Sequence, residues 1–240
     1  MRAITRIIPN TLTCCNLVSG CVATSFAFSG NARLALLWII IGAVFDFFDG
    51  MSARLLNVSS PIGKELDSLA DDVTFGVAPA TIIFSELKVM DYPAIMEATR
   101  SWLPYFAYVV AAFSALRLAK FNLDERQTTS FIGLPTPANA LLWGSLIATR
   151  TDWVESSTMM VPVMLLLICL SSWLLVCELP MFALKFKHWG LKGNEIKYSF
   201  MCGSVIAFTV IGPLDSFWLI IIAYIVVSAL LHVNTLRKAG

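Results

Sequence analysis

Residues 46–71 read DFFDGMSARLLNVSSPIGKELDSLAD and place four aspartates, Asp46, Asp49, Asp67 and Asp71, within strongly apolar sequence. A carboxylate at the centre of a bilayer costs roughly 2.5–3.5 kcal/mol on insertion scales. Four carboxylates on neighbouring helices therefore need compensating partners. Divalent cations and a polar substrate would supply that compensation.

The composition of the whole chain is that of a membrane protein. Of the 240 residues, 58% are hydrophobic and 14% are charged, and the mean hydropathy is +0.76. An ordinary soluble domain is about 25% charged. The net charge of +1 gives no case for nucleic-acid binding. The six cysteines show neither the spacing of a zinc site nor that of a disulfide framework.

Eight segments are apolar over a length that suits a membrane-spanning helix, which needs ~20 such residues. They are residues 11–29, 33–54, 64–86, 101–120, 136–150, 158–182, 195–212 and 215–235. The connections between them are short. The sequence therefore predicts an all-α, polytopic membrane helix bundle with a single domain over residues 1–240.

The distribution of basic residues predicts the orientation of this bundle. With the N-terminus inside, 13 of the 17 lysines and arginines fall on the inner side, and only Arg33, Lys88, Arg100 and Arg150 fall on the other. The positive-inside rule then places both termini and the aspartates on the cytoplasmic side of the plasma (inner) membrane. The first segment could instead be a secretory signal, but its many polar residues argue against a signal core.

The four aspartates fall on two helical stripes. At about 100° per residue, Asp46, Asp49, Gly50 and Ala53 share one face of a helix. A second face carries Gly63, Asp67, Asp71, Thr74 and Ala78. Oxygen-only ligands favour hard cations such as Mg²⁺ or Mn²⁺, and a cluster without histidine or cysteine argues against zinc.

Two divalent ions held by shared carboxylates suit phosphoryl transfer, because they would clamp a diphosphate and stabilise the developing charge. A carboxylate would also accept the proton of an attacking hydroxyl. Two other interpretations stay open. The aspartates would pair with Arg54 and Lys64 in a structural network, or they would line a path for cation transport.

The stretch matches a known family pattern, Asp49-Gly50-x2-Ala53-Arg54-x8-Gly63-x3-Asp67-x3-Asp71, with Asp46 as an additional upstream aspartate. The chain thus resembles the CDP-alcohol phosphatidyltransferases over roughly residues 5–200. This resemblance implies a six-helix core within residues 1–200, mostly additional helices over 201–240, and a homodimer. One departure is Asp72, which replaces a more usual apolar residue and is rotated by about 100° from Asp71.

Other segments resemble the branch of the family that uses serine, the phosphatidylserine synthases. These segments are residues 9–20 (PNTLTCCNLVSG), 67–80 (DSLADDVTFGVAPA), 117–122 (RLAKFN) and 131–138 (FIGLPTPA). The resemblance implies transfer of a phosphatidyl group from CDP-diacylglycerol to L-serine, which gives phosphatidylserine and CMP.

The resemblance also implies roles for particular residues. Asp46, Asp49, Asp67 and Asp71 would bind two Mg²⁺ or Mn²⁺ ions and the diphosphate. The catalytic residues would be Asp71, as the general base, and Asp67. Asp49, Gly50, Ala53, Arg54 and Gly63 would line the CDP site.

Serine needs a partner for its carboxylate, and Arg117 and Lys120 are the candidates, with Asn122 as a third serine-binding residue. Arg117 and Lys120 would alternatively be positive-inside anchors. Asn122 and the segment 133–137 would close the site from the cytosol, or the segment would form a rigid turn before the next helix. Glycerol 3-phosphate and inositol phosphate remain alternative acceptors, and a cation transporter and a non-catalytic assembly subunit remain alternative classes.

Overall fold

The computed structural model describes residues 2–58, 60–124, 131–182, 190 and 194–239. The first half contains α1 (Arg2–Phe28), α2 (Ala32–Leu55), α3 (Pro61–Asp71), the π-helical segment η1 (Asp72–Val77), α4 (Ala78–Val89) and the 3₁₀ helices η2 (Ala94–Thr99) and η3 (Leu103–Tyr108). The second half contains α5 (Val109–Leu123), β1 (Phe131–Ile132), α6 (Thr136–Val154), α7 (Met160–Val176), β2 (Pro180–Met181), α8 (Glu195–Val210) and α9 (Pro213–Ala239).

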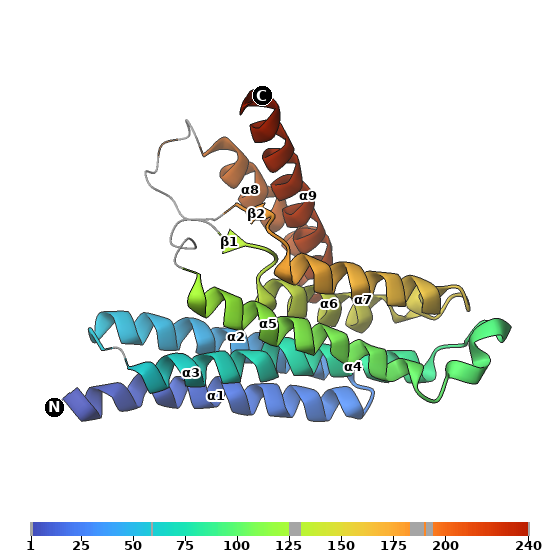
Figure 1. Cartoon of the computed structure of the whole chain (residues 1–240), viewed down its shortest axis with the longest axis horizontal. Helices are drawn as coiled ribbons and strands as arrows, with labels where there is room; N and C mark the ends of the chain where they lie inside the picture. The colour runs from blue at the N-terminus through green and yellow to red at the C-terminus, as the bar shows by residue number, and fades with distance from the viewer. Residues whose placement is uncertain (1, 59, 125–130, 183–189, 191–193, 240) are drawn as a thin grey trace.

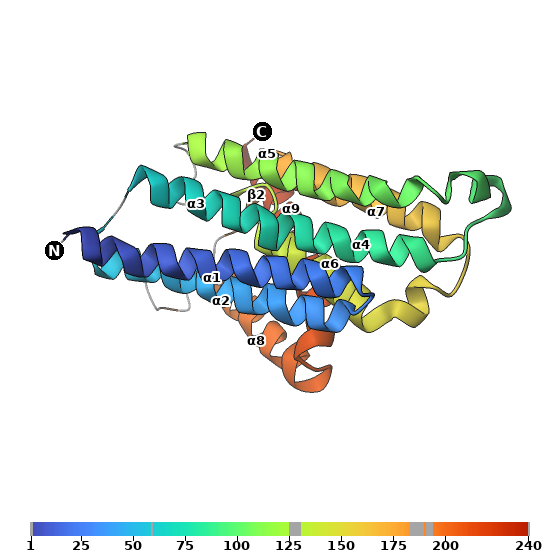
Figure 2. The same cartoon turned by 90° about the horizontal axis from the view of Figure 1, so that it is seen from below.

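Helices α1 to α7 lie side by side along the long axis of the molecule (Figures 1 and 2). Their apolar faces form one core that includes Ala23, Ile39, Phe75, Ile83 and Trp143. The helices occupy all eight segments that the sequence predicts. The prediction of an all-α bundle is therefore confirmed, apart from one short pair of strands.

The lengths of the apolar helices fit a polytopic membrane protein. Among the described residues, four helical stretches are long and apolar enough to cross a membrane: Ile7–Phe28, Ala32–Leu55, Leu103–Leu123 and Pro213–Val233. Helix α7 is a shorter apolar helix. Large hydrophobic side chains such as Phe47, Leu166 and Val205 are exposed on the outside of the protein, where lipid would cover them.

The C-terminal pair of helices has a different direction. Helices α8 and α9 run across the axis of the bundle, and α9 packs against α6 (Figure 1). The hydroxyl of Ser145 on α6 donates to the carbonyl of Leu214 at 2.5 Å, which fixes the start of α9.

The strands β1 and β2 form an antiparallel pair with Phe131 opposite Met181 and Ile132 opposite Pro180. The sequence prediction of a helix through residue 182 is wrong here, because α7 ends at Val176. Gly133 follows β1 with a φ of +75°, and a Cβ at this position would lie 2.7 Å from the carbonyl oxygen of Leu175. The nitrogen of Leu134 donates to Leu174 at 2.8 Å. Segment 133–137 is therefore a turn clamped against α7, as one of the two interpretations predicted.

Helices α3 and α4 form one helical run that the π-helical segment η1 interrupts. Thr74 in this segment donates to the carbonyl of Asn16 on α1 at 3.0 Å. A Cβ on Gly20 would lie 2.8 Å from the Cα atom of Thr74. The absence of a side chain at Gly20 thus lets α1 approach η1 closely, directly after the last aspartate of α3.

Candidate active site

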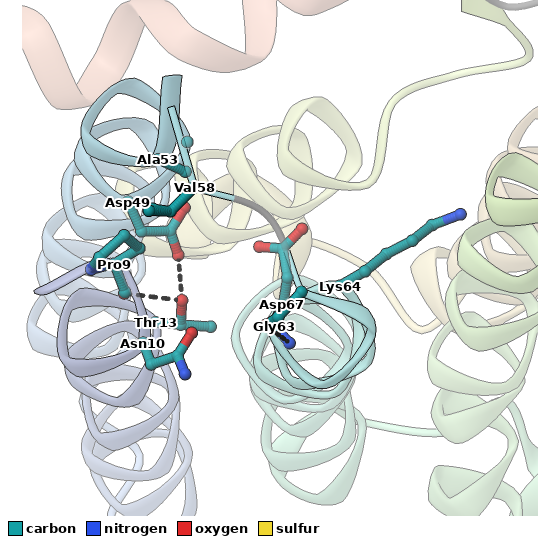
Figure 3. A pocket seen from close by; sticks show the side chains of 11 residues that line it. Pro9, Asn10, Thr13, Asp49, Ala53, Val58, Gly63, Lys64 and Asp67 are labelled. Carbon is teal, nitrogen blue, oxygen red and sulfur yellow. Dashed lines mark hydrogen bonds between the residues drawn. The ribbon is translucent and has the colours of Figure 1, made fainter. Parts of the chain in front are cut away.

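The carboxylates of α2 and α3 meet across the gap between the two helices. One carboxylate oxygen from each of Asp46, Asp49 and Asp67 lies within 4.8 Å of the others. Figure 3 shows Asp49 and Asp67 on opposite sides of this gap. The two stripes predicted from the helical repeat therefore face each other in the structure.

Asp71 lies one turn after Asp67 and interacts electrostatically with Asp46 and Asp67. The side-chain amide of Asn16 on α1 donates to Oδ1 of Asp71 at 3.0 Å. This hydrogen bond fixes the orientation of the Asp71 carboxylate. All four predicted aspartates thus belong to one constellation.

Helix α1 supplies a wall of the site that the predicted set of functional residues did not include. The hydroxyl of Thr13, which is buried, donates to Oδ2 of Asp49 at 2.6 Å (Figure 3). Asn10, Thr13 and Asn16 recur every three residues and so share one face of α1. This polar stripe in an apolar helix was the signal in the sequence that would have identified them.

Among the residues that the structure describes, no lysine or arginine forms an ion pair with the four aspartates, and Arg117 interacts with Asp71 only through a longer-range electrostatic contact. Nε of Arg54 donates to the carbonyl of Gly50 at 3.0 Å. The ammonium of Lys64 donates to the carbonyl of Asn122 at 2.9 Å. Arg54 and Lys64 therefore contact backbone carbonyls instead of the aspartates, and the predicted structural network does not form.

The donor set fits a hard divalent cation. Oδ1 of Asp67 is buried and has no hydrogen-bond partner within the described parts of the chain. The cluster offers only oxygen atoms, which Mg²⁺ and Mn²⁺ prefer. Asp46, Asp49 and Asp67 would hold such an ion, and Asp71 stands beside them.

A cavity of about 240 Å³ opens next to the aspartates between α1, α2 and α3 (Figure 3). Its lining is Pro9, Asn10, Thr13, Asp49, Gly50, Ala53, Val58, Ser60, Gly63, Lys64 and Asp67. Four of the five residues predicted to contact CDP are among them, whereas Arg54 is not. A Cβ on Gly50 would meet no described atom within 4 Å and would project into open space.

The residues predicted to bind serine lie on the other side of α3. The side-chain amide of Asn122 donates to the hydroxyl of Ser68 at 2.7 Å, which ties α5 to α3. Arg117 is buried, and its Nη1 donates to Thr136 on α6 at 3.4 Å. Lys120 is exposed and donates to the carbonyl of Val176 at 3.4 Å. Arg117 also interacts electrostatically with Asp71, so it is near the constellation.

Asp72 points away from the aspartate cluster. Its buried Oδ1 lies beside Gly76, the residue that also faces Ser114 of α5. The 100° rotation relative to Asp71 accounts for this direction.

The comparisons with known proteins agree with this geometry. The family model described as CDP-alcohol phosphatidyltransferase matches residues 6–184, which contain the whole constellation. The chain therefore belongs to the CDP-alcohol phosphatidyltransferase family.

Similar proteins include three named CDP-diacylglycerol–serine O-phosphatidyltransferase. The one from Bacillus subtilis is 40% identical over 131 residues, which cover 54% of this chain and 69% of the relative. The one from Mycobacterium bovis is 30% identical over 230 residues, 91% of this chain and 76% of the relative. The one from Saccharomyces cerevisiae is 40% identical over 126 residues, 48% of this chain and 42% of the relative.

Proposed function

We propose that this protein transfers the phosphatidyl group of CDP-diacylglycerol to the hydroxyl of L-serine and forms phosphatidylserine and CMP. The observation that carries the proposal is the meeting of Asp46 and the three signature aspartates beside a cavity lined by the signature glycines. The names of the similar proteins support serine as the acceptor.

In the proposed reaction, the serine oxygen forms a bond to the β-phosphorus of CDP-diacylglycerol, which carries the diacylglycerol. The bond from that phosphorus to the oxygen bridging to CMP breaks, and the electron pair leaves with CMP. Asp71 accepts the proton of the serine hydroxyl, and Asn16 holds the carboxylate in place. Bound divalent ions, which we take to be two Mg²⁺ or Mn²⁺ ions, would stabilise the negative charge on the diphosphate.

The cytidine diphosphate occupies the cavity between α1, α2 and α3. Gly50, Ala53 and Gly63 admit the nucleotide because they present little or no side chain to it. Arg54, at the end of α2, reaches a phosphate or ribose oxygen after releasing its contact with Gly50. Arg117, Lys120 and Asn122 form the side that receives serine.

The protein works in the plasma (inner) membrane with both termini and the active site in the cytoplasm, as its basic residues indicate. The lipid tails of the donor reach the site from the bilayer, and serine reaches it from the cytosol. In line with the family resemblance, the working unit is a homodimer.

The experiment that tests the proposal is CMP release by the purified protein in detergent. CDP-diacylglycerol is supplied with Mg²⁺ or Mn²⁺ and with L-serine, glycerol 3-phosphate, myo-inositol 1-phosphate or no acceptor. We expect release that depends on serine and stops when EDTA removes the metal. Release with another alcohol alone would change the acceptor, and metal flux into vesicles without any CMP would favour a transporter.

A further inference from the structure

A second cavity, of about 350 Å³, lies where the C-terminal ends of α5 and α7 meet. Its lining is Arg117, Lys120, Leu123, Asp124, Ile132, Leu175, Val176, Cys177 and Glu178. Two basic side chains come from α5, and two acidic side chains come from the residues that follow α5 and α7. The cavity thus presents both signs of charge within a space that suits a small ligand.

The basic side of this cavity has an unsatisfied donor. Only 7% of Arg117 is exposed, and its Nε has no hydrogen-bond partner among the described residues. A buried guanidinium with an unpaired Nε carries a desolvation cost, which a carboxylate ligand would offset. Lys120 extends the basic side, with its ammonium 3.4 Å from the carbonyl of Val176.

The acidic side chains are more exposed than Arg117. Asp124 is half-buried, and Glu178, which follows α7, is exposed, as is Lys120. The cavity therefore holds one deeply buried charge, the guanidinium of Arg117, and charges of both signs nearer to solvent. A ligand with a carboxylate at one end and an ammonium at the other would meet an opposite charge on both sides.

We propose that this cavity binds the acceptor as a zwitterionic amino acid, with its carboxylate on Arg117 and Lys120 and its ammonium facing Asp124 and Glu178. The inference rests on the proposed function and extends it to the selection of the acceptor. Arg117 joins the two sites, because it borders the cavity and interacts electrostatically with Asp71. Asp124 and Glu178 select against acceptors that carry only negative charge, such as a sugar phosphate.

The test compares Glu178→Gln, Asp124→Asn and the double variant with wild-type protein in the CMP assay. We expect each single change to raise the KM for L-serine about threefold and the double change about tenfold, since the acidic side is partly exposed. The kcat and the KM for CDP-diacylglycerol stay unchanged. The control is Glu155→Gln, an exposed carboxylate that follows α6 at the opposite end of α7, and its KM for serine stays at the wild-type value.

Two competitors without a hydroxyl report binding without turnover. L-alanine keeps both charged groups of serine, and propionate keeps only the carboxylate. The double variant should lose inhibition by alanine and keep inhibition by propionate. A wild-type KM for serine in the double variant would overturn the inference and leave the proposed function intact. Wild-type protein without serine-dependent CMP release would overturn both.

Discussion

The aspartate end of helices α1 to α3 and the C-terminal pair α8–α9 are built in opposite ways. In the first region, polar residues such as Thr13, Asn16 and Asp49 are buried among closely packed helices. In the second, no residue of α8 is buried within the described parts of the chain, and an apolar cavity of about 720 Å³ lies between α8 and α9. Chemistry on buried charges needs closely packed helices that fix the polar groups, and α8 has neither buried charges nor comparably close packing.

Substitution of one carboxylate in each region is expected to give the largest difference in kcat between the two regions. Asp71→Asn removes the proposed base and should lower kcat by about a thousandfold, within the usual range for general-base catalysis. The amide has nearly the same shape as the carboxylate, so the variant should elute from a sizing column as wild type does.

The matched change in the other region is Asp215→Asn, in the first turn of α9. It should leave kcat within about twofold, because this half-buried charge lies on α9 outside the aspartate constellation, and a charge at a helix N-terminus typically contributes about 0.3–1 kcal/mol to stability. Comparable losses in the two variants would mean that the constellation is not the catalytic centre.

A smaller effect is expected from the hydrogen bond between α1 and α2. Thr13→Val keeps the shape of the side chain and removes the donor to Asp49. Loss of a hydrogen bond to a charged group should lower kcat/KM about tenfold or more, and the metal concentration for half-maximal activity should rise. Thr13→Ser, which keeps the hydroxyl, is the control. Equal activity of the two variants would show that the hydroxyl does not position Asp49.

The sequence predicts much of the aspartate region. Helical periodicity places Asp46 and Asp49 on one stripe and Asp67 on another, and the cost of burying carboxylates apart from a shared ligand favours an arrangement in which the two stripes face each other. It does not predict that α1 forms the third wall. The contacts from Thr13 and Asn16 join residues 36 and 55 positions apart, and periodicity within one helix carries no such information.

In the C-terminal half, the sequence predicts the helices but not their directions or their ends. Hydropathy predicts α8 and α9, but the direction of a helix depends on its packing, and hydropathy does not encode that. The apolar run after α7 likewise predicts more helix. Its end at Val176 depends on the pairing of Pro180 with Ile132, which lies 48 positions earlier in the sequence.

The closeness of helix packing in the two regions can be compared by substituting two glycines, Gly20 on α1 and Gly203 on α8. Gly20→Ala would bring a Cβ to 2.9 Å from the backbone nitrogen of Thr74. Because backbone atoms cannot move aside cheaply, overpacking should destabilise the protein by about 1–3 kcal/mol. A lower melting temperature in detergent, together with reduced activity from displacement of η1 and Asp71, is the expected result. An unchanged melting temperature would mean that α1 and η1 are less closely packed than they appear.

The smallest effect is expected for Gly203→Ala on α8, where a Cβ would meet no described atom within 4 Å. Alanine forms helix more readily than glycine by about 1 kcal/mol, so this variant should keep full activity and melt at an equal or slightly higher temperature. The same substitution would then have opposite signs in the two regions, and the difference would measure packing rather than helix propensity. A loss as large as that of Gly20→Ala would contradict the comparison, because it would show that another surface, such as a second copy of the chain, covers α8 in the working protein.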